Sequence, residues 1–256
     1  MRLLLCTLLT CSQLVWGSAV ASASSHTSLS ALETDTNRAA DQALRHTESL
    51  ATAISFAFDY LATFLGEAGP PPLVIQAELQ ATTERIDGAR SILVVGRDGE
   101  LLHDAFAYPA PSVNLANRHY IRNALEKPGL QFGEAIVGRT SGVPFAPLSV
   151  FKPSLDAVFT AIIDPRKLRE PLNWCMSLCG GAILTDTGAV IAASPPETVL
   201  SEDLISKILE FEESEGLFRY ERASFGVLVA FRKSNRFPII VITSRAITNT
   251  VSPVTE

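Results

Sequence analysis

The stretch RSILVVGRDGELL, residues 90–102, predicts a β-hairpin: an apolar run, an Asp-Gly turn and a second apolar run. Gly99 suits this tight turn because glycine adopts the positive φ that such turns require. The stretch GGAILTDTGAVIAASPP, residues 180–196, repeats the same order around a Thr-Gly turn. Each hairpin is followed by helical and further strand patterns. The repetition predicts an α+β chain with two similar modules in series, each built on an antiparallel sheet.

Strand and helix patterns continue after each hairpin. In the first unit a short helix precedes three apolar strand candidates, and a short helical segment leaves from Asp164. In the second unit an acidic amphipathic helix precedes three more strands. In chain order, the expected segments are helix 114–127, strands 130–138, 143–151 and 155–164, helical segment 165–172, helix 197–214, and strands 217–223, 225–232 and 237–245.

Residues 32–66 predict one long helix ahead of the first hairpin. Ile54, Phe58 and Leu61 belong to a set of apolar residues that recur at spacings of three, four or seven, and GEAGPPP then stops the helix. A second helix is expected over 73–86. About 35 helical residues extend roughly 50 Å, which is more than a small globule needs. We therefore expect part of this helix to pack against a partner chain, in a homodimer.

The composition excludes some classes of protein. Of the 256 residues, 47% are hydrophobic and 19% charged, with a formal net charge of -6, and the mean hydropathy is +0.23. These values are typical of a folded chain rather than a disordered one. The net negative charge does not indicate the basic surface that binds nucleic acid, so no nucleic-acid partner is expected.

Residues 1–23 have the features of an export signal. Arg2 is followed by the apolar stretch LLLCTLLTCSQLVW and by an ASA motif that ends at Ala23. The competing interpretation is a retained N-terminal anchor, although Ser12 and Gln13 interrupt the apolar run and leave it shorter than the roughly 20 residues that span a bilayer. We expect an exported protein, either released by cleavage or anchored by this segment.

Four cysteines are present, and two of them, Cys6 and Cys11, lie within the signal. Export would leave the pair Cys175 and Cys179 in an oxidising compartment, where a disulfide is favoured and two free thiols are the alternative. A metal site is not predicted, because no histidine or acidic ligand lies nearby to complete a coordination shell. A Cys-x3-Cys bridge would be strained inside a regular helix, so a disulfide predicts an irregular segment here.

The sequence contains no motif for catalysis. It has no Gly-x-Ser-x-Gly elbow, no Cys/His pair with a local signature and no phosphate-binding Gly-x4-Gly-Lys-Ser loop. Its histidines are scattered, and none forms a His-x3-His pair. We therefore predict that the protein is not an enzyme and needs no cofactor or metal. The four histidines are His26, His46, His103 and His119.

The predicted helix 114–127 concentrates polar and aromatic side chains. Arg118 and Arg122 are four residues apart and would share a helix face, whereas Tyr120 would point elsewhere. In one interpretation both arginines are exposed to solvent and Tyr120 is half-buried. In the other, Arg118 and Tyr120 border a pocket where a guanidinium grips a carboxylate. Asn114 or Asn117 is the expected N-cap.

Four segments together resemble double Cache (dCache, PAS-like or PDC) domains, the extracytoplasmic sensors of bacterial histidine kinases, chemoreceptors and diguanylate cyclases. NLANRHYIRNAL resembles the family's Asp-x-x-x-Arg-x-Tyr-Phe helix, and FGEAIVGRTSG its Gly-x-Pro-x-x-Gly-Arg-x-Ser-Gly turn. VFTAIIDPRKL is similar to the strand and helix start that close the first module, and GGAILTDTGAVIAASPP to the first hairpin of the second. The resemblance spans residues 32–245.

The resemblance implies a domain layout and a set of pocket residues. Arg118 and Tyr120 correspond to pocket residues of the family, and Arg139 and Ser141 are weaker candidates, with Arg139 expected mainly to brace the turn. The implied layout is a long helix at 32–66, a membrane-distal PAS-like module at 73–170, a smaller membrane-proximal PAS-like module at 178–246 and a flexible tail at 247–256.

The sequence departs from the family pattern at three positions of these motifs. Asn114 stands where the family often has Asp, Ile121 replaces the second aromatic residue, and Ala135 occupies the usual proline position. The aspartate that binds an amine in some family members is not identified here, so an amino-acid ligand is not implied.

The resemblance implies binding rather than turnover. We expect a stand-alone, exported, periplasmic sensor that binds a small, anionic metabolite and signals through a separate protein such as a kinase or cyclase, because no second membrane span or output domain follows. An anchored form would face the periplasm from the inner membrane. The alternative is a non-sensing structural or interaction protein with a degenerate Cache pocket.

Overall fold

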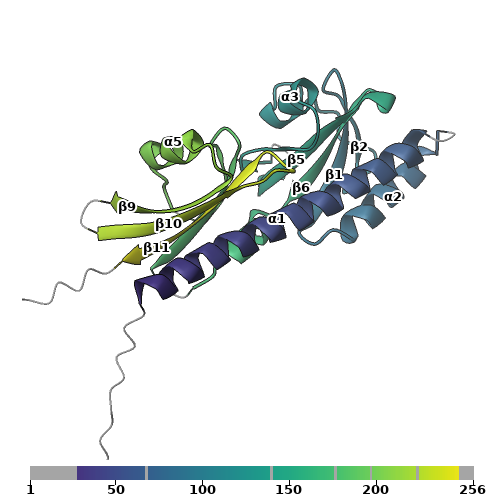
Figure 1. Ribbon diagram of the computed structural model, residues 1–256. Coiled ribbons are helices and arrows are strands. Elements are labelled where there is room, and N and C mark those ends of the chain that lie inside the picture. The colour runs from purple at the N-terminus through teal and green to yellow at the C-terminus, as the bar shows by residue number, and fades with distance from the viewer. Residues whose placement is uncertain are drawn as a thin grey trace, which may run out of the picture.

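Two antiparallel sheets lie one after the other along a single long helix in the computed structural model of the chain (Figure 1). The structure describes residues 28–66, 69–138, 141–175, 178–196, 198–222 and 225–247. The predicted fold class is confirmed, because the chain is α+β with a long N-terminal helix and two antiparallel sheets. The predicted signal 1–23 lies outside the described residues, as does the predicted tail apart from Ile247.

Helix α1 spans Leu29–Gly66, 38 residues, and so begins before the predicted residue 32. Its C-terminal half buries large side chains, including Phe58, whose ring lies 5.7 Å from that of Phe159 in the first sheet. Its N-terminal half lies on the second sheet, where Thr243 Oγ1 donates to the Thr36 carbonyl at 2.8 Å. One helix therefore contributes to the packing of both sheets.

The apolar character of α1 extends beyond its buried face. Within the described part of the chain, α1 is the one helix long and apolar enough to cross a membrane by length and composition, with an 18-residue window of mean hydropathy 1.3. The same helix also carries the buried side chains that pack against the two sheets.

The first sheet has the strand order β2-β1-β6-β5-β3, and β4 also pairs with β5. The hairpin predicted from residues 90–102 forms its β1–β2 edge, and the turn glycine, Gly99, has φ +89°. The strands are β1 (Ala89–Gly96), β2 (Leu101–Asp104), β3 (Gln131–Phe132), β4 (Ile136–Val137), β5 (Pro144–Lys152) and β6 (Ala157–Ile163).

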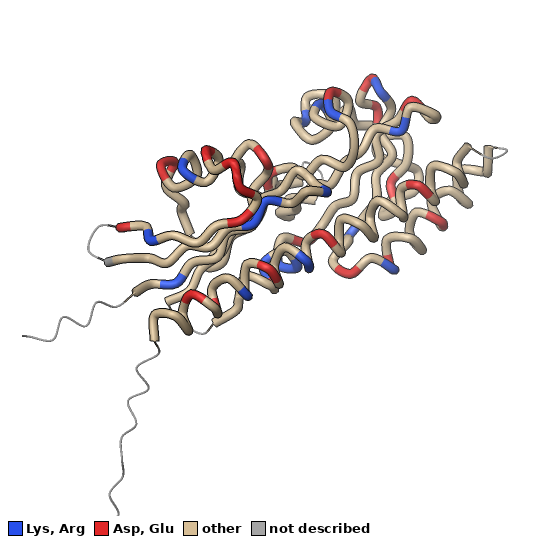
Figure 2. Tube along the Cα trace, in the orientation of Figure 1, with Lys and Arg blue, Asp and Glu red and all other residues tan. Residues whose placement is uncertain are grey.

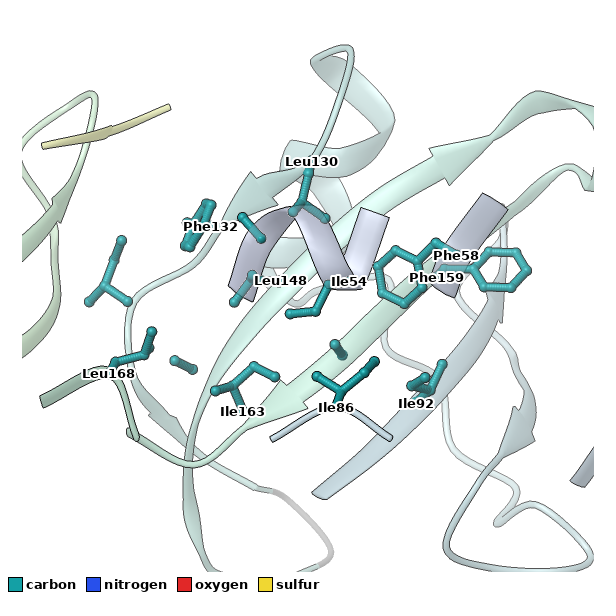
Figure 3. Packing of buried hydrophobic residues seen from close by; sticks show 14 of the residues in the cluster. Ile54, Phe58, Ile86, Ile92, Leu130, Phe132, Leu148, Phe159, Ile163 and Leu168 are labelled. Carbon is teal, nitrogen blue, oxygen red and sulfur yellow. The ribbon is translucent and has the colours of Figure 1, made fainter. Parts of the chain in front are cut away.

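The two faces of the first sheet pack against different elements. Alternate residues of a strand point to opposite faces, and β6 divides its side chains accordingly. Phe159 and Ile163 join the cluster that includes α1 residues Ile54 and Phe58 (Figure 3). Val158 joins the cluster on the α3 side of the sheet. The helices of this half are α2 (Pro72–Glu84), α3 (His119–Glu126) and α4 (Pro165–Arg169), with short 3-10 turns η1 (Pro153–Leu155) and η2 (Glu170–Leu172).

The single strand predicted at 130–138 is wrong. The structure has two short strands there, β3 and β4, and both pair with β5. Pro147 of β5 has no amide hydrogen to donate, so the ladder is interrupted opposite Gly133. Gly133 itself donates to the Pro147 carbonyl at 2.9 Å, and a Cβ at this position would come within 2.7 Å of the proline ring. Close contact between these two residues thus divides the strand.

The second sheet has the order β8-β7-β11-β10-β9, with α5 on the face opposite α1. The helix predicted at 197–214 is shorter in the structure, because Ser201 caps it at its start and Phe211 is extended after its end. Acidic residues are concentrated along α5 and the loop that follows (Figure 2). The elements are β7 (Cys179–Thr185), β8 (Val190–Ser194), α5 (Glu202–Glu210), β9 (Glu215–Arg222), β10 (Phe225–Lys233) and β11 (Ile239–Ile247).

We expect Phe58→Ala to lower the free energy of unfolding by about 3–5 kcal/mol, because it removes a fully buried ring and leaves a cavity beside Phe159. Phe56→Ala is the matched control, since Phe56 lies on the same helix with 70% of its surface exposed. Urea titration at a concentration low enough to dissociate any dimer measures both. Equal effects of the two substitutions would contradict the packing of α1 against the first sheet.

Candidate ligand-binding site

A cavity of about 660 Å³ opens on the face of the first sheet that α1 does not cover. Its walls come from β1, β2, the segment between β2 and α3, the start of α3, the turn before β5, β5, β6 and α4. The lining is mainly apolar. Its apolar members are Leu93, Leu101, Phe106, Pro111, Val113, Leu115, Val143, Phe145 and Ile162, and its other members are Arg90, Ser91, Asp104, Arg118, Tyr120, Gly138, Ser141 and Arg166.

Arg118 lies at the N-terminus of α3 rather than within the helix. It is the N-cap residue, with φ -80° and ψ 129°, so the predicted cap at Asn114 or Asn117 is wrong. Asn114 instead donates to the Asp98 carbonyl at 3.1 Å and accepts from the Ala116 amide at 2.9 Å. These bonds tie the segment before α3 to the turn of the first hairpin.

The extended conformation of Arg118 separates it from Arg122. Arg118 lines the cavity, whereas Arg122 is exposed and contacts His119 at 3.1 Å. The prediction that the two arginines share a helix face is therefore wrong, because only Arg122 lies within α3. Arg118 is half-buried, and its guanidinium has no acidic partner among the described residues.

Tyr120 and Ser141 also line the cavity, beside Arg118. Tyr120 is buried, and its ring meets Phe145 of β5 edge-on with 6.1 Å between ring centres. Ser141 accepts a hydrogen bond from the Val143 amide at 3.3 Å. The structure thus brings three of the four sequence-predicted pocket residues together, while Arg139 lies outside the described residues.

Arg90, Asp104, Asp164 and Arg166 are polar residues of the site that the motifs did not identify. The Asp164 carboxylate accepts from Arg166 Nη2 at 2.6 Å and pairs with Arg90 Nη2 at 2.8 Å. Hydrogen bonds from Arg166, and then from Arg90, hold the pKa of Asp164 well below its usual range despite burial. Asp164 also caps α4 through the Arg166 amide. The Asp-Pro pair after strand β6 was the sequence signal for this cap.

Asp104 ends strand β2 and accepts two hydrogen bonds. Its Oδ1 accepts from Ser91 Oγ at 2.7 Å and from the Phe106 amide at 2.9 Å. The cavity is therefore lined by three arginines and one aspartate. Asp164 lies outside the lining and pairs with two of these arginines, Arg90 and Arg166. The net charge of this group is positive.

No protein-family model matches the sequence, and no curated protein matches it either. Solved structures do match. The extracellular domain of rpHK1S-Z16, described as a histidine kinase, aligns with a TM-score of 0.75 at 19% identity, over 88% of this chain and 99% of that domain. The ligand-binding domain of the Campylobacter jejuni chemoreceptor Tlp3, solved with 4-methylisoleucine, aligns with a TM-score of 0.62 at 12% identity over 89% and 95%. That of the Pseudomonas fluorescens chemoreceptor CtaA, solved with L-alanine, gives 0.66 at 11% over 86% and 100%.

The chain has the fold of extracellular Cache-type sensory domains. In this Cache fold the cavity belongs to the first sheet. The corresponding helix-covered face of the second sheet is packed, because Phe211, Phe218 and Phe231 form an aromatic cluster there with ring centres 5.0–6.4 Å apart.

The junction between the two Cache sheets carries a disulfide. Cys175 and Cys179 are bonded, with their Cα atoms 6.0 Å apart, within the usual range for such a bridge. Cys175 lies outside any helix and Cys179 begins β7, so neither cysteine belongs to a helix, while residues 176 and 177 lie outside the described residues. Trp174 Nε1 donates to the Gly180 carbonyl at 3.3 Å beside it.

We expect Asp164→Asn to lower the free energy of unfolding by about 2–4 kcal/mol at pH 7, because it leaves Arg90 without its buried partner while Asn still caps α4. The folded-state pKa of Asp164 is below that of an unfolded aspartate, so its contribution is complete above about pH 4 and is lost as the pH falls below that value.

Urea titrations of the wild type and Asp164→Asn between pH 7 and pH 2.5 measure this difference, which should shrink in acid. Asp156→Asn is the control, because the Asp156–Arg97 pair is largely exposed and contributes little. A difference that stays constant below pH 4 would show that Asp164 is not held as an ion.

Proposed function

We propose that this chain is a sensory domain that binds a small, carboxylate-bearing metabolite in the cavity of its first module, residues 73–170. Arg118 carries this proposal, because it is half-buried, lines the cavity and has no acidic partner among the described residues. A guanidinium removed from water needs an anion to compensate its charge. A ligand carboxylate supplies that anion and can accept two parallel hydrogen bonds from the fork of nitrogens.

The rest of the lining supports binding rather than catalysis. The described residues that line the cavity include no histidine or cysteine. The two serine hydroxyls of the lining are bonded within the protein: Ser141 accepts from the Val143 amide, and Ser91 donates to Asp104. Apolar walls with a few convergent polar groups are typical of sites that hold a small molecule.

Signalling would pass from the cavity to the second module and on to a separate protein, such as a kinase or cyclase. Helix α4 supports this route, because it starts at the Arg166–Asp164 pair beside the cavity and packs against β8 of the second sheet. The chain would act as an exported, periplasmic protein after removal of residues 1–23, or as an inner-membrane protein anchored by them.

A homodimer through α1 is part of the same proposal. Phe56, Tyr60 and Phe64 follow one another at four-residue spacing and so share one face of α1. Phe56 and Tyr60 are 70% and 48% exposed. Leu73 and Val74, at the start of α2, are 59% and 47% exposed. A second copy of α1 would cover this aromatic face, which an isolated chain leaves in water.

We expect Arg118→Gln to weaken the binding of a carboxylate ligand by about 2 kcal/mol, or roughly thirtyfold, since it removes a charge-assisted bidentate contact. Arg122→Gln is the matched control, because Arg122 is exposed on α3 and lies outside the lining. A thermal-shift screen of organic acids and amino acids identifies a ligand, and calorimetry then compares the variants.

Undiminished binding by Arg118→Gln would overturn the assignment of Arg118. If no acid raises the melting temperature of well-folded protein, the sensing proposal loses its support. The alternative would then be favoured: an interaction protein whose Cache cavity is degenerate and whose exposed α1 face contacts another chain.

We expect Phe56→Glu to shift the protein from dimer to monomer, because it places a charge in an apolar contact. Sedimentation velocity across a range of protein concentrations measures the distribution. Val199→Glu is the control, since Val199 is 75% exposed and lies before α5, away from α1. A monomeric wild type at high concentration, or a Phe56→Glu variant that still dimerises, would contradict the proposed interface.

A further inference from the structure

We infer that the ligand of the first-module cavity is an amphipathic monocarboxylic acid with a long or bulky apolar body and no α-ammonium group. This inference rests on the proposed function, since it assumes that Arg118 holds the carboxylate. It goes further by naming what the remainder of the cavity recognises.

The two acidic groups of the site both accept hydrogen bonds within the protein, and one of them, Asp164, is also paired with cations. Asp164 is paired with both Arg90 and Arg166. Asp104 accepts through one oxygen from the Ser91 hydroxyl and the Phe106 amide, so its role is to hold β1 and the segment after β2 together. An α-ammonium would bring a further positive charge into a site whose lining is already net positive. A ligand with a carboxylate alone neutralises Arg118 and adds no second cation.

The size and chemistry of the walls fit an apolar body. The cavity volume of about 660 Å³ lies in the range of pockets that hold drug-sized molecules, and a free aliphatic amino acid would leave much of it to water. Most of the lining consists of aliphatic and aromatic side chains from β1, β2, β5, β6 and the segment before α3. Burial of an apolar ligand surface against such walls is favourable, whereas apolar side chains provide no hydrogen-bond acceptor for an ammonium group.

The rim of the cavity extends the apolar surface outward. Phe106 is 84% exposed and Val143 is 43% exposed, although both line the cavity. They come from opposite walls, one after β2 and the other before β5. An apolar chain that reaches from Arg118 to the rim would cover both side chains. A small polar ligand confined to Arg118 would leave them in water.

A homologous series tests this inference on the full chain. Isothermal titration with hexanoate, octanoate and decanoate, each below its micellar concentration, should show the affinity rising roughly fourfold per methylene, as expected for burial of each CH₂ group. Octanoate should bind at least tenfold more tightly than 2-aminooctanoate. Octylamine and 1-octanol, which keep the chain but lack the carboxylate, should bind at least tenfold more weakly than octanoate.

Two substitutions locate the parts of the ligand. Arg118→Gln should weaken all three acids by a similar factor, with Arg122→Gln as control. Phe106→Ser should weaken decanoate more than hexanoate, whereas Tyr108→Ser, which alters an exposed residue outside the lining, should leave the series unchanged.

The outcomes separate this inference from the proposed function. Tighter or equal binding of 2-aminooctanoate through Arg118, or an affinity independent of chain length, would overturn the ligand class and leave carboxylate sensing intact. Equal binding of octanoate and 1-octanol would show adsorption without recognition and would overturn the inference. If neither the acids nor the amino acids bind a protein that unfolds cooperatively, both the inference and the proposed function fail.

Discussion

Burial of one face of α1 against both sheets is the contact on which the arrangement of the molecule depends. Among the described elements, α1 is the main helix on that face of both sheets, and α2 adds contacts with β1 and β2 of the first sheet. Buried residues of α1 and of the sheet faces that it covers form one cluster, which includes Phe58, Phe159 and Val241. Because a packed core has little room to deform, α1 fixes the position of one sheet relative to the other.

The two halves of α1 hold the sheets by different means. The C-terminal half uses large apolar side chains such as Ile54 and Phe58. The N-terminal half combines small residues with polar bonds: Arg232 of β10 is 9% exposed and donates from Nε to Asp41 at 2.6 Å. The same Arg232 nitrogen also lies 3.3 Å from Glu215 Oε2, so the guanidinium is paired with two carboxylates. With α1 covering one face of the first sheet, the opposite face remains open for the cavity, where Asp164 offsets two of the three lining arginines.

Local signals in the sequence predicted much of the architecture. These signals are the hairpin around Gly99, the long helix and the second hairpin at 180–196. They depend on backbone conformation and on apolar periodicity, which residues close in the sequence determine. The errors occurred where distant segments meet. Pro147 divides the strand predicted at 130–138, and the contacts of Asn114 with the hairpin turn displace the expected helix cap.

The sequence by itself determined the α+β class, the serial order of two similar units and the candidacy of Arg118 and Tyr120. Only the tertiary structure decided that Arg118 lines a cavity while Arg122 does not, because that depends on where α3 begins. It also decided that Arg90 and Arg166 neutralise Asp164. Arg90 lies 74 positions before Asp164, and no local pattern records a pairing between residues that only the folded sheet brings together.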